Sequence, residues 1–354
     1  MCKLRLNCNH RVSCHQRHTP LLHKCVAEVV GTFFLVFFGT GINSVAIATG
    51  ATSGIWQGAV CWGYGAALSV YLTAGVSGAH LNPAVSFSLL LFRRDEMPPK
   101  YFFPYVISQF FGALFAGIMV YANFGSSLEA KEDALGIERG DSESVETAAG
   151  FGEYYPDPAY PSIPQSAVST AGAFWMQVFA TGIMLMFVVG LTDERNPSRP
   201  TPGMIPFFIG MLISVLICLF APYNQAGMNP WRDFCPRLVA LWFGWGDIAI
   251  PGPRNGFWIY LLAPMIGAPL GVFAYDVLIR PAFPTEAEDL ESTSKRERPP
   301  SGLWANDQTD IQRIVRELRQ TDIGQLQSTL RGNSQMNGSI GPNVVSVAAM
   351  DSMA

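Results

Sequence analysis

Long apolar windows dominate the pattern of hydrophobic and polar positions along the chain. Six of them hold about 20 residues each, which is the length that an α-helix needs to cross the core of a bilayer. They run over residues 26–47, 55–74, 102–122, 171–191, 203–222 and 257–279. The pattern therefore predicts an all-α membrane protein with six transmembrane helices.

Two Asn-Pro pairs, Asn82-Pro83 and Asn229-Pro230, lie in gaps between these windows. Asn is a favoured N-cap residue, and Pro is tolerated at the first helical position because its missing N–H would have no partner there. Each pair therefore predicts the start of a helix. The apolar run behind the first pair, residues 85–92, is too short to cross a bilayer. We expect two half-length helices that enter from opposite faces and meet at mid-membrane.

The two halves of the chain repeat one arrangement. Asn82 and Asn229 lie 147 positions apart, and Glu28 and Gln177, each near the start of a similar apolar window, lie 149 positions apart. Each half holds three windows and one half-helix, and because three is odd the halves cross the membrane in opposite directions. We expect an inverted repeat, with repeat one over residues 25–122, a loop over 123–170 and repeat two over 171–280.

The distribution of charge predicts which side each segment faces. Only 14% of the residues are charged, against about 25% in soluble domains, which favours a lipid environment. Basic residues lie in the tail 1–24, before the third window at Arg93 and Arg94, and after the sixth at Arg280. The positive-inside rule then places both termini in the cytoplasm. The acidic loop 123–170 is expected to be an outer, largely irregular cap, and most of the tail 281–354 to be disordered.

The sequence predicts no metal or cofactor site. Cys2, Cys8 and Cys14 interleave with histidines, but they lack the close pairing of structural zinc sites, so a disordered basic tail is the simpler interpretation. A helix over residues 311–326 would have one apolar and one basic face, which fits a membrane surface or a solvated helix equally well. The net charge of -4 gives no indication of nucleic-acid binding.

The Asn-Pro segments carry a family resemblance. The runs from Tyr71 to Val85 and from Gly227 to Phe234 closely resemble the aquaporin superfamily, and within it the aquaglyceroporin or glycerol facilitator branch, over residues 24–280. The resemblance implies a right-handed helix bundle, assembled as a homotetramer in the plasma membrane. It also implies a passive channel for glycerol, other small polyols and uncharged solutes, and water. No nucleophile or metal-ligand set accompanies these residues, so we expect no enzyme.

The resemblance also assigns candidate roles to single residues. The implied constriction at mid-membrane is formed by Asn82, Pro83, Ala84, Asn229, Pro230 and Trp231. In the implied selectivity filter, the donors of Arg232 face solute hydroxyls and the Trp62 ring faces solute C–H groups. A carboxylate inside an apolar span is costly without partners, so Glu28, with His80, is expected to hold the first Asn-Pro loop from behind, as Gln177 would hold the second. Asp233, directly after Arg232, is typical of the glycerol branch.

Two positions depart from the family pattern. Trp231 stands where relatives carry Ala, and Ala226 stands where glycerol facilitators often carry an aromatic ring. We expect Tyr223 as an alternative source of that ring and Ile217 as the remaining filter wall. The alternatives that stay open are a water-selective channel, an ion-coupled transporter, and a poorly conducting scaffold whose waist Trp231 blocks.

Overall fold

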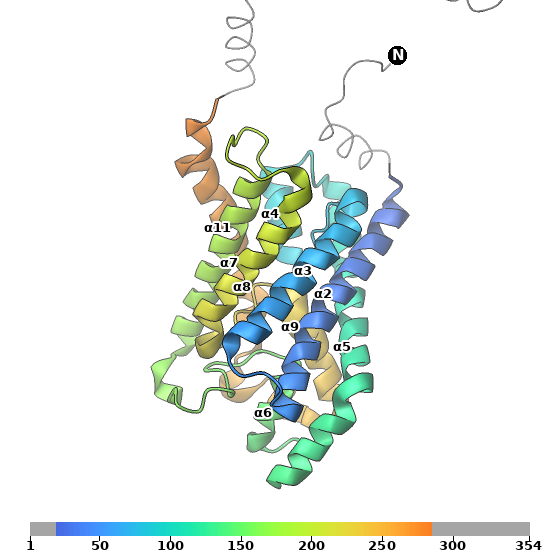
Figure 1. The fold of residues 1–354 in the computed structure, drawn as a ribbon, viewed down its shortest axis with the longest axis vertical. Helices are drawn as coiled ribbons and strands as arrows, with labels where there is room; N and C mark the ends of the chain where they lie inside the picture. The colour runs from blue at the N-terminus through green and yellow to red at the C-terminus, as the bar shows by residue number, and fades with distance from the viewer. Residues whose placement is uncertain (1–18, 285–354) are drawn as a thin grey trace, which may run out of the picture. The chain divides into compact units, whose positions relative to one another are not determined.

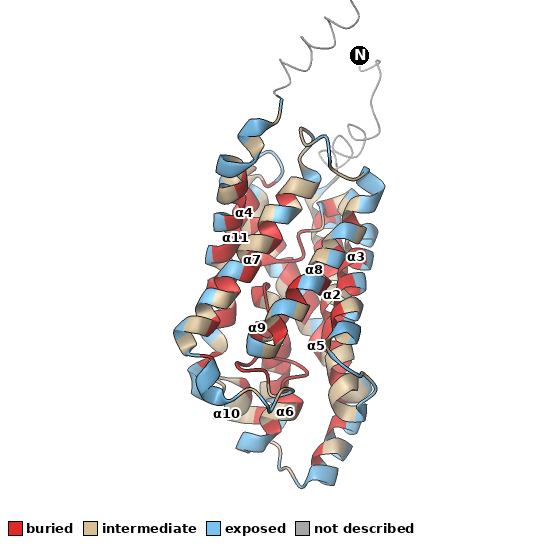
Figure 2. Ribbon diagram, turned by 60° about the vertical axis from the view of Figure 1, so that its left-hand side comes forward, coloured by how far each residue is buried: buried red, intermediate tan, exposed pale blue. Residues whose placement is uncertain are grey.

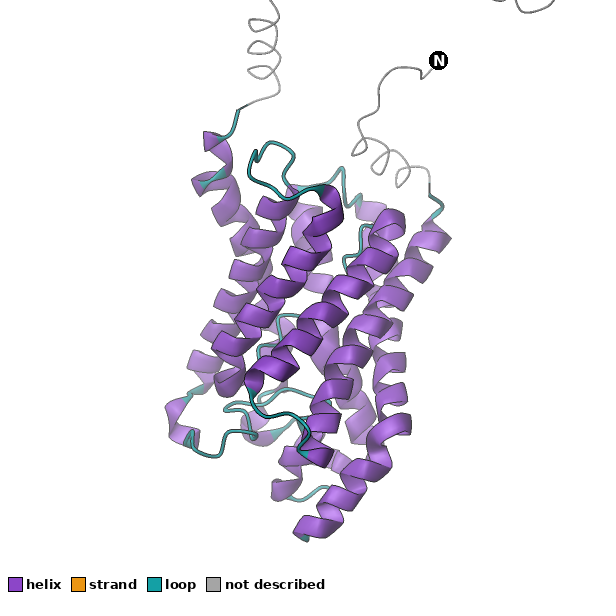
Figure 3. Ribbon diagram, viewed as in Figure 1, coloured by secondary structure: helices purple, strands orange, loops and turns teal. Residues whose placement is uncertain are grey.

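The computed structural model describes residues 19–284. The tails 1–18 and 285–354 lie outside the described residues, and with them the interleaved Cys and His residues and the segment 311–326. Helices form the described part of the chain (Figures 1 and 3). The long helices are α2 (Leu21–Thr49), α3 (Ile55–Ser77), α5 (Pro99–Leu135), α7 (Thr170–Thr192), α8 (Ile205–Asn224) and α11 (Phe257–Leu278).

Two half-length helices complete the bundle. Helix α4 (Pro83–Phe92) has 10 residues and α9 (Pro230–Ala240) has 11. At 1.5 Å per residue each is about 15 Å long, half the thickness of a bilayer core. Six of the described helices are long and apolar enough to span a membrane. The prediction of six spanning helices and two half-helices in an inverted repeat is confirmed.

The third long helix differs from the prediction in its length. The sequence assigned residues 123–135 to the loop, but α5 continues through them and ends at Gly136, whose φ of 67° closes the helix in the left-handed region. This segment contains several good helix formers and no proline, so nothing in it stops the helix.

Short elements form the rest of the loop region. The connection after α5 contains the turn η1 (Ser142–Ser144), helix α6 (Val145–Ala148) and the turn η2 (Gln165–Ala167). The turn η3 (Pro202–Met204) precedes α8, and α9 is followed by the π-turn η4 (Leu241–Trp245), helix α10 (Gly246–Ala249) and the turn η5 (Pro253–Asn255), with η6 (Arg280–Ala282) after α11.

Helix packing follows the repeat. In the first half α2 packs on α3 and α5, and in the second half α7 packs on α8 and α11. The half-helices cross over: α4 packs on α11 and α9 packs on α5, so each lies against a long helix of the other half. The start of α2 and the end of α11 lie at one end of the bundle, and α6 lies at the other (Figure 1).

The two halves also meet directly, at a contact between α3 and α8. A Cβ atom placed on Gly63 would lie 2.3 Å from the carbonyl oxygen of Gly210, and one on Gly210 would lie 2.3 Å from that of Gly63. Only glycine allows backbones to approach this closely. Figure 2 shows the buried positions gathered on the sides of the helices that face one another. Large apolar side chains such as Phe103 and Leu262 are exposed.

Candidate functional site

The two Asn-Pro pairs each cap a half-helix. Asn82 Oδ1 accepts a hydrogen bond from the backbone N–H of Ala84 at 2.9 Å. Asn229 Oδ1 accepts from the N–H groups of Trp231 and Arg232, at 3.1 and 3.4 Å. Each cap satisfies donors that have no partner inside the helix, and it fixes the side-chain oxygen toward its own helix.

The side-chain nitrogens of the same asparagines join the two halves. Asn82 Nδ2 donates to the backbone oxygen of Met228, and Asn229 Nδ2 donates to that of Leu81, both at 2.9 Å. The bonds are reciprocal, because each amide binds the residue that precedes the other asparagine. An amide nitrogen carries two hydrogens, so each Asn has a second one to offer.

The backbone approaching both asparagines follows the same unusual path. Ala79 and Leu81 have φ of 52°, and their counterparts Ala226 and Met228 have φ of 55° and 49°. Left-handed φ at such residues costs about 1–3 kcal/mol each and persists only where the surroundings impose it. The loops therefore need firm anchors.

Glu28 anchors the first loop. Its Oε1 accepts from the N–H of His80 at 3.0 Å and from Ser77 Oγ at 2.6 Å. Its Oε2 accepts from the N–H of Leu81 at 2.8 Å and from Gln109 Nε2 at 2.7 Å. The fully buried carboxylate thus has four donors. The His80 ring contacts Ser86 Oγ through Nδ1 at 3.1 Å.

Gln177 lies behind the second loop in the matching place. Its Oε1 accepts from the N–H of Met228 at 3.1 Å, and its Nε2 donates to the backbone oxygen of Asn224 at 3.1 Å. An amide can do both because it carries one acceptor and one donor group. Two of the four donors to Glu28 are N–H groups of the first loop, whereas Gln177 binds one N–H of the second loop and one carbonyl at the end of α8.

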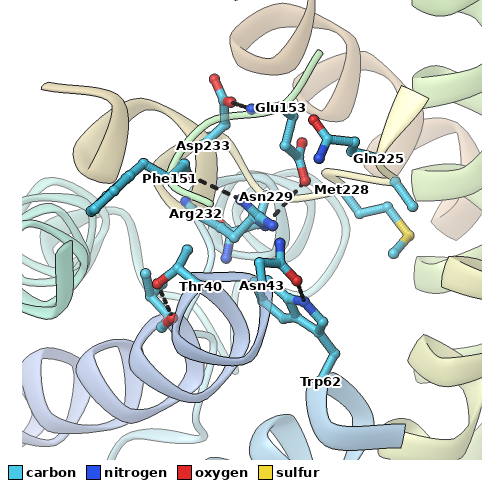
Figure 4. Close-up of polar contacts among 12 residues, drawn as sticks. Thr40, Asn43, Trp62, Phe151, Glu153, Gln225, Met228, Asn229, Arg232 and Asp233 are labelled. Atoms are coloured by element: carbon cyan, nitrogen blue, oxygen red, sulfur yellow. Dashed lines mark hydrogen bonds and ion pairs between the residues drawn. The ribbon is translucent and has the colours of Figure 1, made fainter. Parts of the chain in front are cut away.

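A second cluster lies beyond the asparagines, around Arg232 (Figure 4). The Arg232 guanidinium lies over the Trp62 ring, 4.3 Å from its centre. Trp62 donates its indole N–H to Asn43 Oδ1 at 3.1 Å, so this N–H is already used. A Cβ atom on Gly39 would lie 2.1 Å from the Trp62 ring. The ring can therefore pack against α2 only because residue 39 has no side chain.

Arg232 forms an ion pair with a loop residue. Its Nε lies 3.0 Å from Oε1 of Glu153, and its Nη1 donates to the backbone oxygen of Phe151 at 3.4 Å. Asp233 pairs with Arg237 at 2.7 Å and accepts from the N–H of Glu153 at 2.7 Å. Arg232 therefore pairs with Glu153, and Asp233 pairs with Arg237.

A sequence model of the major intrinsic protein family matches residues 15–275. The chain belongs to this family. Curated members of the family include the glycerol uptake facilitator of Pseudomonas aeruginosa, 38% identical over 79% of this chain and 97% of its own length. The propanediol uptake facilitator of Citrobacter freundii is 37% identical over 76% of this chain and 96% of its own length.

A solved structure shares the fold. The aquaglyceroporin of Plasmodium falciparum superimposes with a TM-score of 0.63, at 24% identity, over 77% of this chain and all of that one. Six spanning helices and membership of the major intrinsic protein family make the protein an integral, multi-pass membrane protein.

The three remaining filter candidates, Ile217, Ala226 and Tyr223, lie in different surroundings. Ile217 and Ala226 are buried in one apolar cluster with Trp62. Tyr223 is 43% exposed and continues a stripe of exposed side chains on α8. That stripe consists of Phe208, Met211, Val215, Leu219 and Tyr223. The expectation that Tyr223 supplies the missing ring is corrected, because its helical phase turns it away from the buried face of α8.

Trp231 packs against α5. Its indole N–H donates to the backbone oxygen of Val106 at 2.9 Å, and its ring makes an edge-on contact with Phe110, the centres 5.5 Å apart. Trp231 also packs against the buried cluster of Val36, Ala113, Ala116 and Cys235. The large ring thus fills space between α9 and α5.

Sequence reasoning missed Glu153 and Asn43, which contact Arg232 and Trp62. Glu153 is one of nine carboxylates between residues 123 and 170, and nothing in that stretch distinguishes a buried acid from a solvated one.

Proposed function

We propose that the protein is a passive channel for glycerol, other small uncharged solutes and water. The single observation that carries this proposal is the reciprocal pair of hydrogen bonds between the asparagines and the opposite loops. It leaves two fixed amide donors at the junction of two helix N-termini, where a solute oxygen is favoured and a cation is not. The names of the curated relatives point to the same class of solute.

The Arg232 and Trp62 pair supports selection of polyols. Nε of Arg232 pairs with Glu153 and Nη1 donates to Phe151, whereas Nη2 makes no hydrogen bond within residues 19–284. Its N–H groups are therefore free to donate to the oxygen of a solute hydroxyl. The flat Trp62 ring offers no free polar group to a carbon edge. A solute with hydroxyls on one edge and C–H on the other matches both surfaces.

Purified protein in lipid vesicles tests the proposal. Stopped-flow light scattering after a glycerol shock is expected to show shrinkage followed by fast re-swelling, and a sucrose shock is expected to show shrinkage alone. Re-swelling no faster than in empty vesicles would overturn the glycerol assignment. Fast shrinkage without re-swelling would favour the water-selective alternative.

The exclusion of ions is tested at Arg232. Arg232→Ala removes the positive charge from the outer cluster, and we expect a proton or potassium leak at least about tenfold above that of the wild type, since a charge near the passage repels cations by more than 1.4 kcal/mol in a low dielectric. The leak is read with a pH-sensitive dye inside the vesicles. An unchanged leak would remove Arg232 from this role.

The packing of Trp231 disfavours the scaffold alternative. Its ring is used in contacts with α5, and its N–H is bonded to Val106. A blocked waist would need this ring between the two half-helices.

We also propose that four copies assemble in the plasma membrane with both termini in the cytoplasm and the loop 136–169 outside. The basic residues at the inner ends and the acidic loop support this orientation. A membrane-impermeant thiol reagent applied to intact cells is expected to label Glu143→Cys, and labelling only after lysis would reverse the orientation. Light scattering in detergent checks the tetramer.

A further inference from the structure

The carboxylate of Glu153 lies beside Arg232 and has unused hydrogen-bond acceptors. Its side chain is fully buried, and both of its oxygens lack a hydrogen bond within the described residues. The 3.0 Å approach of Arg232 Nε is an ion pair without good hydrogen-bond geometry. Buried acids usually have their acceptors filled, so this one retains unused capacity to accept hydrogens.

The second Asn-Pro loop makes room for this carboxylate. A Cβ atom on Gly227 would lie only 1.9 Å from Glu153 Oε2. The equivalent position in the first loop, two residues before Asn82, is His80. Glu153 therefore fills the space that a side chain at 227 would take, next to Ala226, where the aromatic ring of the family pattern is missing.

The backbone of Glu153 is fixed from three directions. Its N–H donates to Asp233 Oδ1 at 2.7 Å, and its carbonyl accepts from Arg237. The next N–H, of Tyr154, donates to Gln225 Oε1 at 2.5 Å. These bonds fix the backbone of Glu153, and with it the place from which its side chain reaches Arg232.

Charges around Glu153 come from three elements. Helix α9 contributes Arg232, Asp233 and Arg237, helix α11 contributes Tyr260, and the loop contributes Tyr154 and Asp157. Arg237 and Asp233 neutralise each other at 2.7 Å, which leaves Glu153 as the counter-charge of Arg232.

Burial sets the titration of the loop acids. It raises the pKa of the Glu153 carboxyl from 4.5 to about 8, although Arg232 acts in the opposite direction. Burial likewise raises the pKa of Asp157 to about 7. An acid with a raised pKa is neutral below that value and ionised above it.

We propose that Glu153 is a third side chain of the outer constriction and a determinant of its specificity, because it sets the net charge there and holds Arg232 against Trp62. The proposal rests on the channel function above. When Glu153 is ionised the constriction is neutral overall and Arg232 is held to one side, so hydroxyl solutes pass. When Glu153 is protonated, Arg232 is uncompensated and binds solute oxygens more tightly, which slows their release.

The test is a pH profile of flux through vesicles. We expect glycerol permeability of the wild type to rise about tenfold from about pH 6 to about pH 10, with its midpoint near the pKa of Glu153. Glu153→Gln keeps the shape without the charge and is expected to be slow at every pH. The matched control Glu143→Gln, at an exposed acid of the same loop, is expected to keep the wild-type profile. A profile that survives Glu153→Gln would overturn the proposal.

Two further variants guard against misinterpretation. Asp157→Asn is expected to keep the pH dependence of glycerol flux. Loss of this dependence in the variant would show that Asp157, and not Glu153, is the titrating group. Gly227→Ala should displace the carboxylate and reduce glycerol flux, whereas the same change in a Glu153→Ser background should have little effect, because the clashing atom is gone. Equal effects in both backgrounds would contradict the assigned contact.

Failure of the proposed function gives a different result. If the wild type passes water and not glycerol, the glycerol assignment fails, and the pH profile of water flux still tests Glu153. If nothing passes, infrared difference spectra still report the group directly: a protonated carboxyl band should vanish as pH rises through about 8 and be absent from Glu153→Gln. A spectrum that is unchanged by the substitution would refute the titration.

Discussion

The two Asn-Pro loops share one backbone path and differ in almost everything that holds it. The first has a buried carboxylate with four donors behind it, and His80 beside it. The second has the amide of Gln177, with one bond accepted and one donated, and glycine in place of the histidine. The surroundings of the first loop are therefore occupied by Glu28 and His80, whereas beside the second loop there is room for Arg232 and Glu153.

The helix starts differ in the same way. Ala84 is fully buried in the first half, whereas Trp231 in the second is bonded to α5. The small residue allows the first half-helix to approach its neighbours, and the large one adds a contact that secures the second half-helix from its other side. In the second half, the two hydrogen bonds of Gln177 behind the loop are thus accompanied by the contact of Trp231 with α5 at the start of the half-helix.

Breaking the anchor of the first loop is expected to have the largest effect. Glu28→Gln replaces one acceptor oxygen by a donor, so up to two of the four buried donors lose their partner, at about 1–3 kcal/mol each. Thermal unfolding in detergent, followed by a thiol-reactive dye, should show a clear loss of stability. A shift no larger than that of Glu143→Gln would mean that the four contacts do not hold the loop.

The reciprocal change in the second loop should cost less. Gln177→Glu keeps the bond from Met228, and a buried carboxyl that stays protonated can donate its O–H to the carbonyl of Asn224, so we expect a loss of no more than about 1–3 kcal/mol. The same unfolding assay measures it. If this variant were less stable than Glu28→Gln, the number of hydrogen bonds at Glu28 and Gln177 would not predict how much each residue stabilises its loop.

Trp231→Ala tests the contact with α5. We expect a loss of about 1–2 kcal/mol from the hydrogen bond to Val106 and the packing on Phe110. Glycerol flux per folded protein is expected to stay within about twofold of the wild type, because the ring lies between helices. Flux that rises by an order of magnitude would place the ring in the passage instead.

The smallest effect is expected at His80. His80→Ala loses the contact with Ser86, about 1 kcal/mol, while the backbone N–H that binds Glu28 remains. The pH profile of flux should not change, in contrast to Glu153→Gln. A flattened profile in this variant would move the titrating group to the first loop.

The long helices and half-helices could be predicted because their signals are local. Apolar windows and Asn-Pro caps act within a few residues, so Asn82 and Asn229 identified both helix starts. The extension of α5 to Leu135 was missed because charged residues were taken as the end of the span, although they are good helix formers.

The cluster around Arg232 could be predicted only in part. Tyr223 follows Val215 and Leu219 at a spacing of four residues, but only the structure shows that this stripe of α8 is exposed. Glu153 could not have been selected, because its position depends on Asp233 and Arg237, 80 and 84 residues away. The direction of the Trp231 ring depends in the same way on Val106, 125 residues away.

The reciprocal amide bonds have a consequence for the order in which the chain is made. Asn82 leaves the ribosome long before Met228, so its side-chain nitrogen must wait for a partner that does not yet exist. Until then Glu28, which is made earlier still, holds the first loop through the N–H groups of His80 and Leu81. Glu28, which has four hydrogen-bond donors, thus belongs to the half that is synthesised before its partner exists. Gln177, which makes two hydrogen bonds, belongs to the half that is synthesised after the first half is complete.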